Sequence, residues 1–224
     1  MSCFPRRNDT MKISIIGATG DMGYGLALRL IMAGHDVCIG SRQAEKAQEA
    51  AQRAKKATGK DNVVGMANPD ACRRAELVVI AVPSAGHRAT LETLKEDIGT
   101  TPVLDVTIPL AIKPIRFAPP AEGSNAQETK AILGENSRVA SGFHTIAGEM
   151  LSDLANPVEG DLLVAGDDNE LIDMILELGR EMGLRGFNAG RLHHAVTLES
   201  LTPMLIGMNR RYGKRHIGIG IVGV

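Results

Sequence analysis

Three glycines, with two other residues between each and the next, constrain the fold of this chain more than any other feature of its sequence. Gly17, Gly20 and Gly23 form a G-x-x-G-x-x-G motif between a β-branched segment, residues 12–16, and a helical segment, residues 24–33. In that context the first glycine permits a tight turn, the second lets the backbone approach a pyrophosphate, and the third lets the helix pack closely. A tight turn without a ligand is the alternative, but it does not need three glycines, each of which costs conformational entropy. The motif therefore predicts a dinucleotide-binding Rossmann unit with the pyrophosphate at the helix N-terminus.

The end of the second predicted strand, residues 36–40, indicates which dinucleotide binds. An acidic residue there would accept a hydrogen bond from the ribose 2′-hydroxyl of NAD, whereas an arginine accommodates the 2′-phosphate of NADP. The chain has Ser41 and Arg42 at this position, with Thr19 across the glycine turn and Lys46 one helical turn further on. Arg42 and Lys46 could alternatively be solvated charges at a helix start. The predicted NADP(H)-binding residues of this half are Gly17, Thr19, Gly20, Asp21, Met22, Gly23, Ser41, Arg42 and Lys46.

Apolar strands alternate with helices over the first two thirds of the chain. Further strands are predicted at residues 63–66, 77–82, 103–106 and 138–143, and helices at residues 43–58, 70–74, 89–96 and 129–133. Continuous apolar strands separated by helices are typical of a parallel sheet covered on both faces. We expect an irregular extension over residues 1–10 and a doubly wound α/β Rossmann domain over residues 11–142.

The remaining residues predict a small C-terminal α/β lobe, residues 143–224, for substrate binding and dimerisation. It would contain strands at 162–165 and 184–188 and helices at 170–182 and 192–211, the last interrupted by Pro203. Four prolines and a polar stretch within residues 109–127 predict a loop with little regular structure.

Composition excludes several classes of protein. A formal net charge of −1 argues against a nucleic-acid partner, and no apolar run is long enough for a transmembrane helix, so we expect no membrane partner. Cys3, Cys38 and Cys72 are odd in number and widely separated, which fits neither a disulfide framework nor a zinc site and favours a cytoplasmic location. Aromatic residues make up only 3% of the chain, so a flat ligand would lie against aliphatic side chains.

Several motifs together resemble the NADPH-dependent reductases of coenzyme F420, the F420H2:NADP oxidoreductase family. The resemblance runs from Met11 almost to the C-terminus. It is carried by the glycine turn, Gly-Leu-Ala-Leu-Arg-Leu at 25–30, Gly-His at 34–35, Gly-Ser-Arg at 40–42, His-Thr-Ile at 144–146, Gly-Asp-Asp at 166–168 and Glu-Ser-Leu-Thr-Pro at 199–203. The last three motifs lie outside any general Rossmann pattern.

The resemblance implies a homodimer that transfers a hydride reversibly between NADP(H) and the deazaflavin coenzyme F420, from nicotinamide C4 to deazaflavin C5 or back. It implies that Thr19, Ser41, Arg42 and Lys46 hold the 2′-phosphate and that Val82 and Pro83 lie along the dinucleotide. His144, Thr145 and Ile146 would line the place where the two rings stack. Substrate-binding residues would be His144, Ile146, Ser200, Thr202 and Pro203, although Ser200 and Thr202 could instead bond carbonyls of their own helix.

Hydride transfer between stacked rings requires proximity and exclusion of water, which need no acid or base. We therefore predict no catalytic side chain and no metal. Two departures from the family pattern, Ala147-Gly148-Glu149 and the composition of residues 114–127, concern the deazaflavin side of the site. The basic cluster at residues 209–216 either complements a helix dipole or receives the anionic tail of the deazaflavin.

Two other functions remain open from the sequence. The chain could be an NADPH-dependent reductase of another acceptor, such as the imine pyrroline-5-carboxylate, a pterin or a flavin, because many activities share this nucleotide-binding half. It could also be a non-catalytic NADPH sensor that binds a protein partner.

Overall fold

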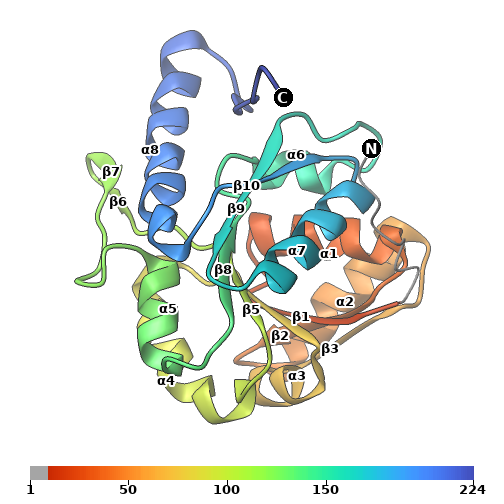
Figure 1. Cartoon of the computed structure of the whole chain (residues 1–224). Helices are drawn as coiled ribbons and strands as arrows, with labels where there is room; N and C mark the ends of the chain where they lie inside the picture. The colour runs from red at the N-terminus through yellow and green to blue at the C-terminus, as the bar shows by residue number, and fades with distance from the viewer. Residues whose placement is uncertain (1–9) are drawn as a thin grey trace.

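The computed structural model describes residues 10–224. Apart from Thr10, the irregular extension predicted for residues 1–10 lies outside the described residues. An eight-stranded sheet runs through the centre of the molecule, in the order β10-β9-β8-β5-β4-β1-β2-β3 (Figure 1). Its strands are β1 (Lys12–Ile16), β2 (Asp36–Ser41), β3 (Val63–Ala67), β4 (Leu77–Ile80), β5 (Val103–Asp105), β8 (Val139–Gly142), β9 (Asp161–Gly166) and β10 (Arg185–Asn188).

The strand pairing confirms the predicted Rossmann-like α/β architecture. Within this sheet, all neighbours from β3 across to β8 pair in parallel, and β8 and β9 are its one antiparallel pair among the described strands. The chain order changes direction between β1 and β4, so the glycine turn after β1 lies at the crevice where open α/β sheets bind ligands.

Helices cover both faces of the sheet, because the strands are apolar on both sides. One core contains apolar residues of α1 (Asp21–Ala33), α2 (Ala44–Thr58) and α7 (Asn169–Glu181). The other contains residues of α3 (Asn68–Arg74), α4 (His87–Ile98) and the first turn of α5 (Asn125–Leu133). These helices overlap the predicted ones, and their ends differ from the predictions by at most four residues.

The C-terminal part continues the same sheet. Strands β9 and β10 are parallel to each other, are joined by α7, and extend the sheet beyond β8. A short 3-10 turn, Leu192–His194, leads into the last helix, α8 (Ala195–Tyr212), which contains the buried Pro203. The boundary between two domains at residue 142 stays a prediction.

The proline-rich segment is more regular than expected. Within residues 109–127 the chain forms an antiparallel hairpin of β6 (Leu110–Ile112) and β7 (Ile115–Phe117), and α5 begins already at Asn125. The expectation of a largely irregular loop is therefore wrong for this hairpin. Strands of three residues are too short to show an alternating pattern in sequence.

A second element without a sequence signal is the short helix α6 (Gly148–Ser152), which packs against α1.

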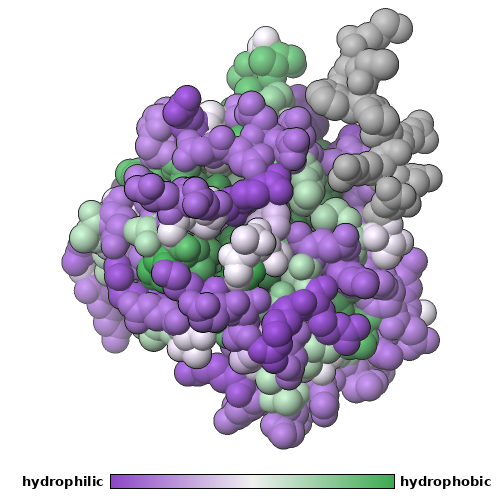
Figure 2. All heavy atoms as spheres, turned by 60° about the horizontal axis from the view of Figure 1, so that its bottom comes forward, coloured by the Kyte–Doolittle hydropathy of each residue, from purple (hydrophilic) through white to green (hydrophobic). Residues whose placement is uncertain are grey.

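Helix α8 stands beside the hairpin, at the edge of the sheet where β5 and β8 end (Figure 1). The face shown in Figure 2 is mainly hydrophilic, with apolar atoms recessed between polar ones. None of the helices in the described part of the chain is long and apolar enough to cross a membrane.

Candidate active site

The glycine turn has the geometry that a dinucleotide requires. Gly17 has a φ of 94°, and a Cβ there would lie 2.7 Å from the Ala81 carbonyl oxygen. A Cβ on Gly23 would lie 2.8 Å from Ala18 Cα, so this glycine allows α1 to pack closely on the turn. At Gly20, by contrast, a Cβ would find its nearest neighbour 3.9 Å away, and no side chain caps the N-terminus of α1. The turn is therefore open at the position where a pyrophosphate would approach the helix.

The residues predicted to bind the 2′-phosphate lie around the end of β2. Thr19, Arg42 and Lys46 are exposed, and Ser41 is half-buried. The Ser41 hydroxyl oxygen accepts a hydrogen bond from the backbone N–H of Gln43 at 3.2 Å, so its own proton is available as a donor. The structure thus presents two cations and hydroxyl donors to solvent beside the open turn, which fits a dianionic group. Their role in NADP(H) binding stays a prediction.

His144, Thr145 and Ile146 follow β8 directly and are all buried. Phe143, just before them, has a φ of 70°, which is uncommon for a residue with a side chain and turns the chain sharply at the sheet edge. His144 Nε2 lies 2.7 Å from the Ser141 hydroxyl, whereas His144 Nδ1 is buried and has no hydrogen-bond partner among the described residues. Burial lowers the pKa of His144 to about 4, so the imidazole is neutral near pH 7. A buried, unpaired ring nitrogen fits a site that a polar ligand completes.

Helix α8 meets this turn. The Thr202 hydroxyl donates to the His144 carbonyl oxygen at 2.7 Å, across 58 residues of sequence. The Ser200 hydroxyl instead donates to the Thr197 carbonyl oxygen in its own helix at 2.8 Å. The structure therefore brings Thr202 to the predicted ring site, whereas Ser200 forms the local bond that was its alternative. Pro203, the next residue of this motif, is buried.

Val82 and Pro83 lie just after β4, at the same edge, and lead through the 3-10 turn Ser84–Gly86 to His87. Val82 is half-buried and Pro83 is exposed, so this segment can lie along a ligand in the crevice. His87, the first residue of α4, is buried and begins a polar network that the sequence did not predict.

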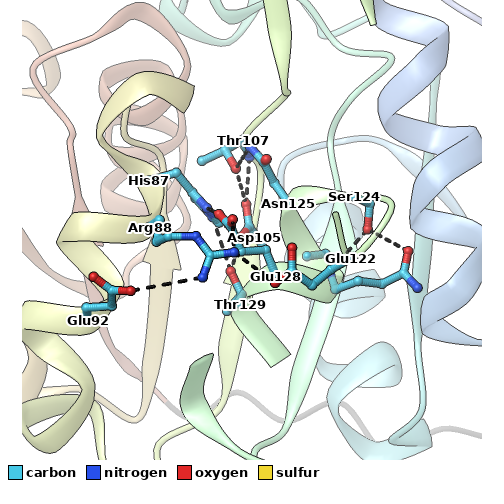
Figure 3. Close-up of polar contacts among 12 residues, drawn as sticks. His87, Arg88, Glu92, Asp105, Thr107, Glu122, Ser124, Asn125, Glu128 and Thr129 are labelled. Atoms are coloured by element: carbon cyan, nitrogen blue, oxygen red, sulfur yellow. Dashed lines mark hydrogen bonds and ion pairs between the residues drawn. The ribbon is translucent and has the colours of Figure 1, made fainter. Parts of the chain in front are cut away.

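The network joins β5, α4 and α5 through buried charged groups (Figure 3). His87 Nε2 lies 2.8 Å from Asp105 Oδ2, and His87 Nδ1 lies 2.6 Å from Glu128 Oε2. Thr129 Oγ1 donates to Asp105 Oδ2 at 2.6 Å, and Arg88 pairs with Glu128 from the solvent side.

The network continues from Asp105 toward α8. The Thr107 hydroxyl donates to Asp105 Oδ1 at 2.6 Å and accepts from Asn125 Nδ2 at 2.8 Å. The backbone N–H groups of Asn125 and Ala126 donate to the two carboxyl oxygens of Glu199, at 2.8 and 3.1 Å. Glu199 belongs to α8, so its carboxyl group fixes that helix to the N-terminus of α5.

The environment shifts the pKa values of these groups. Burial alone would lower the pKa of His87, but its hydrogen bonds and charge interactions with Asp105 and Glu128 raise it to about 9. Burial opposes ionisation of Asp105, yet the charge and hydrogen bond of His87, with bonds from Thr107 and Thr129, hold its pKa below the ordinary value. Burial and the nearby charge of Asp105 raise the pKa of Glu199 to about 8. Near neutral pH, His87 and Asp105 therefore form a buried ion pair, and the Glu199 carboxyl group is mainly protonated.

The two departures from the family pattern also have structural consequences. Gly148 packs against the start of α1, because a Cβ there would lie 2.8 Å from the Met22 nitrogen. Glu149 Oε2 lies 2.9 Å from His216 Nε2 and 3.4 Å from Arg215 Nη2. The last part of the basic cluster is thus already paired with a carboxylate. The other departure, residues 114–127, contains the second strand of the hairpin and the start of α5.

Sequence reasoning missed His87, Asp105, Thr107 and Glu128. Each is an ordinary polar residue in sequence, and they are separated by up to 41 residues. The available signal was the position of Asp105 and Thr107 at the end of an apolar strand, which places polar groups at the ligand edge of a parallel sheet.

Comparison with known proteins identifies relatives over nearly the whole chain. The sequence profile of the family described as "NADP oxidoreductase coenzyme F420-dependent" matches residues 12–109. The F420-dependent NADP reductase of Methanocaldococcus jannaschii is 38% identical over 223 residues, which cover 96% of this chain and 99% of that protein. The enzyme of the same name from Methanothermobacter thermautotrophicus is 37% identical, with 96% of each chain covered.

A solved structure shows the same fold. The putative F420-dependent NADP reductase from Arthrobacter superposes with a TM-score of 0.82 over 95% of this chain and 100% of that one, at 23% sequence identity. Its low identity supports the fold alone, whereas the identities of 37–38% over 96% of the chain establish the family. The predicted resemblance is confirmed, and the chain belongs to the family of F420-dependent NADP reductases.

Proposed function

We propose that this protein is an NADP-dependent oxidoreductase that transfers a hydride reversibly between NADP(H) and coenzyme F420. The observation that supports this most is the hydrogen bond between Thr202 and the His144 carbonyl. This bond joins the His144–Ile146 segment to α8. Neither segment belongs to the general Rossmann pattern, and both are part of the predicted ring site. The names of the nearly full-length relatives support the same pair of substrates.

The residues of the Rossmann half bind and orient the NADP(H). The open turn at Gly20, with the N-terminus of α1, receives the pyrophosphate, and Arg42 with Ser41, Thr19 and Lys46 receives the 2′-phosphate. Val82 and Pro83 lie along the dinucleotide and direct the nicotinamide toward the end of β8.

The residues after β8 and on α8 form the place where the rings meet. When both substrates are bound, nicotinamide C4 and deazaflavin C5 supply the hydride chemistry directly, with no metal and no acid–base side chain. The buried segment His144–Ile146 excludes water from one side, and Thr202 holds its backbone. A neutral His144 presents an unpaired nitrogen without placing a positive charge beside the oxidised nicotinamide.

The proposal includes a cytoplasmic homodimer, as the resemblance implies. Met204 on α8 is 50% exposed and Ile112 at the tip of the hairpin is 72% exposed, and β7 lies against α8. These apolar side chains give the two elements a surface that a second copy could cover. Light scattering after size-exclusion chromatography measures the oligomeric state, and a monomer would contradict this part.

The first experiment mixes the purified protein with NADPH and oxidised F420 and follows the visible absorbance of the deazaflavin. We expect rapid loss of that absorbance with NADPH, and much less with NADH or with FMN as acceptor. With NADPH deuterated at the transferred position of C4, the label should appear at C5 of the reduced deazaflavin. Label lost to solvent would contradict direct transfer. Tight NADPH binding without reduction of F420 would favour another acceptor, and no oxidation by any acceptor would favour a sensor.

A further inference from the structure

The buried network connects the separate walls of the candidate ring site. His87 begins α4, directly after the segment that contains Val82 and Pro83. Asp105 and Thr107 mark the end of β5, and Asn125 begins α5. Glu199 lies three residues before Thr202, so the same stretch of α8 contacts both the network and the His144 carbonyl. Figure 3 shows the side chains of α4, β5 and α5 converging between these elements.

Stability alone does not account for such an arrangement. Burying charged groups costs free energy, and well-packed apolar side chains often hold elements together equally well or better. Directional hydrogen bonds also fix geometry, because a fully paired network specifies the relative positions of the elements that carry it. In this protein those elements are the β4–α4 segment on one side and α8 on the other.

Among the described residues, Thr107 is the side chain that hydrogen-bonds both to Asp105 and to the side chain of Asn125 at the N-terminus of α5. On one side its hydroxyl and its backbone N–H both donate to Asp105 Oδ1, at 2.6 and 2.9 Å. On the other side the same hydroxyl oxygen accepts a hydrogen bond from Asn125 Nδ2. The backbone N–H of Asn125 in turn donates to the Glu199 carboxyl group on α8. Thr129 also donates to Asp105, but its hydroxyl contacts only the His87 half.

We propose that Thr107 is a positioning residue for hydride transfer, which links the β4–α4 wall of the ring site to α8 and so fixes the relative placement of the two rings. This inference rests on the proposed function. Small displacements of reacting atoms reduce the rate of transfer strongly. The affinity for NADP(H), by contrast, depends in the proposed function mainly on pyrophosphate and 2′-phosphate contacts in which Thr107 takes no part.

The test compares two isosteric substitutions. Thr107→Val removes the hydroxyl at the link, and Thr129→Val removes a buried hydroxyl that also donates to Asp105 but lies off the link. Thr107→Ser restores the hydroxyl and is the rescue variant. For each protein we would measure the melting temperature, the Kd of NADPH, the single-turnover rate of F420 reduction, and the primary deuterium isotope effect on kcat.

We expect Thr107→Val to slow single-turnover hydride transfer by about tenfold or more, with an unchanged Kd of NADPH. Its isotope effect on kcat should increase, because the chemical step becomes more rate-limiting. Thr129→Val should lose a similar amount of thermal stability but transfer the hydride nearly as fast as the unaltered protein, and Thr107→Ser should recover most of the rate.

The outcomes separate the two proposals. If the unaltered protein does not reduce F420 with NADPH, the proposed function fails and the inference fails with it. If the unaltered protein does so, but Thr107→Val and Thr129→Val lose the same rate in proportion to their stability, Thr107 is only structural and the inference alone fails. Should Thr107→Val not fold, Asn125→Ala cuts the same link from the other side, and an unchanged transfer rate in that variant overturns the inference.

Discussion

Arg42 directly follows β2, at the position that we propose selects NADP(H) over NAD(H). It is exposed beside the open glycine turn, and no acidic residue stands at this position. We expect Arg42→Ala to weaken NADPH binding by about 10- to 100-fold, because a hydrogen bond to a charged group contributes roughly 1.5–3 kcal/mol. Isothermal titration of NADPH and of NADH with both proteins measures the effect.

The matched control is Lys56→Ala, which removes an exposed cation from the far end of the same helix, α2. That variant should bind NADPH as the unaltered protein does. Equal weakening of NADPH and NADH by Arg42→Ala would show that Arg42 does not select the 2′-phosphate.

The buried, neutral His144 predicts that the free energy of unfolding decreases at acid pH. Burial lowers its pKa to about 4 from an ordinary value of 6.5, so the unfolded chain takes up a proton that the folded protein excludes. The stabilisation is complete above pH 6.5 and is lost as the pH falls toward 4, by on the order of 2 kcal/mol at pH 4.5. Urea unfolding of the unaltered protein and of His144→Asn at pH 7 and 4.5 tests this. Equal acid destabilisation of both proteins would contradict it.

At the scale of single residues, sequence and structure differ most clearly on α8. Ser200 and Thr202 occupy the same motif, and the sequence left each with two alternative partners. The structure separates them, because Thr202 reaches the His144 carbonyl and Ser200 stays within its helix. Which carbonyl a hydroxyl reaches depends on how α8 lies against β8, a tertiary contact that residue type does not encode.

At the scale of elements, the long apolar strands and their helices could be predicted, and the short elements could not. Strands β1, β2 and β4 are short and mainly apolar and alternate with helices, a pattern that favours a covered parallel sheet. Hairpin β6–β7 and helix α6 have three to five residues each, too few for a periodic pattern. The buried network was missed for another reason. Its members come from β5, α4, α5 and α8, and only the assembled fold brings them together.

The contact between α8 and the N-terminus of α5 predicts a loss of stability as the pH rises from 5 to 8.5. Burial and the charge of Asp105 raise the pKa of Glu199 to about 8, from an ordinary value of 4.5. A raised pKa stabilises the folded protein fully below pH 4.5, and this contribution is lost as the pH rises through 8. The stability of the unaltered protein relative to Glu199→Gln should therefore fall between pH 5 and 8.5.

Urea unfolding of the two proteins at several pH values measures that difference. Glu199→Gln keeps the size of the side chain and does not titrate, so the change with pH isolates the carboxyl group. His87 titrates in both proteins, so the difference between them reports Glu199 together with its charge interaction with His87. Parallel stability curves over this range would show that Glu199 is not held protonated in the folded protein.

At the scale of the whole molecule, one sheet carries both the nucleotide-binding strands and the C-terminal unit. Strand β9 pairs with β8, which leads to the His144 turn, and Thr145 Oγ1 donates to the Asp161 carbonyl at the start of β9. The final segment returns to this place, since the Asp161 N–H donates to the Ile219 carbonyl at 2.9 Å. The returning segment therefore lies beside the start of β9 and close to the turn that contains His144 and Thr145.

The basic cluster at the end of α8 lies just before that returning segment. Arg215 and His216 pair with Glu149, whereas Arg210, Arg211 and Lys214 are exposed and have no ion pair among the described residues. Cations at a helix C-terminus complement its dipole, at about 0.3–1 kcal/mol each, and this alone could explain them. The alternative is that they attract the phosphate and glutamates of the deazaflavin tail.

The triple variant Arg210→Ala, Arg211→Ala, Lys214→Ala distinguishes these roles when two acceptors are compared. If the cluster receives the tail, the variant should have a raised KM for F420 that no longer increases with salt, because screening acts on the lost attraction. A deazaflavin without the phosphate and glutamate tail is the matched control, and its KM should be the same for both proteins. Lower thermal stability with an unchanged KM for F420 at low and high salt would leave the helix dipole as the only role. Because the three cations lie outside the buried network, the hydride-transfer rate at saturating substrate should not change in either case.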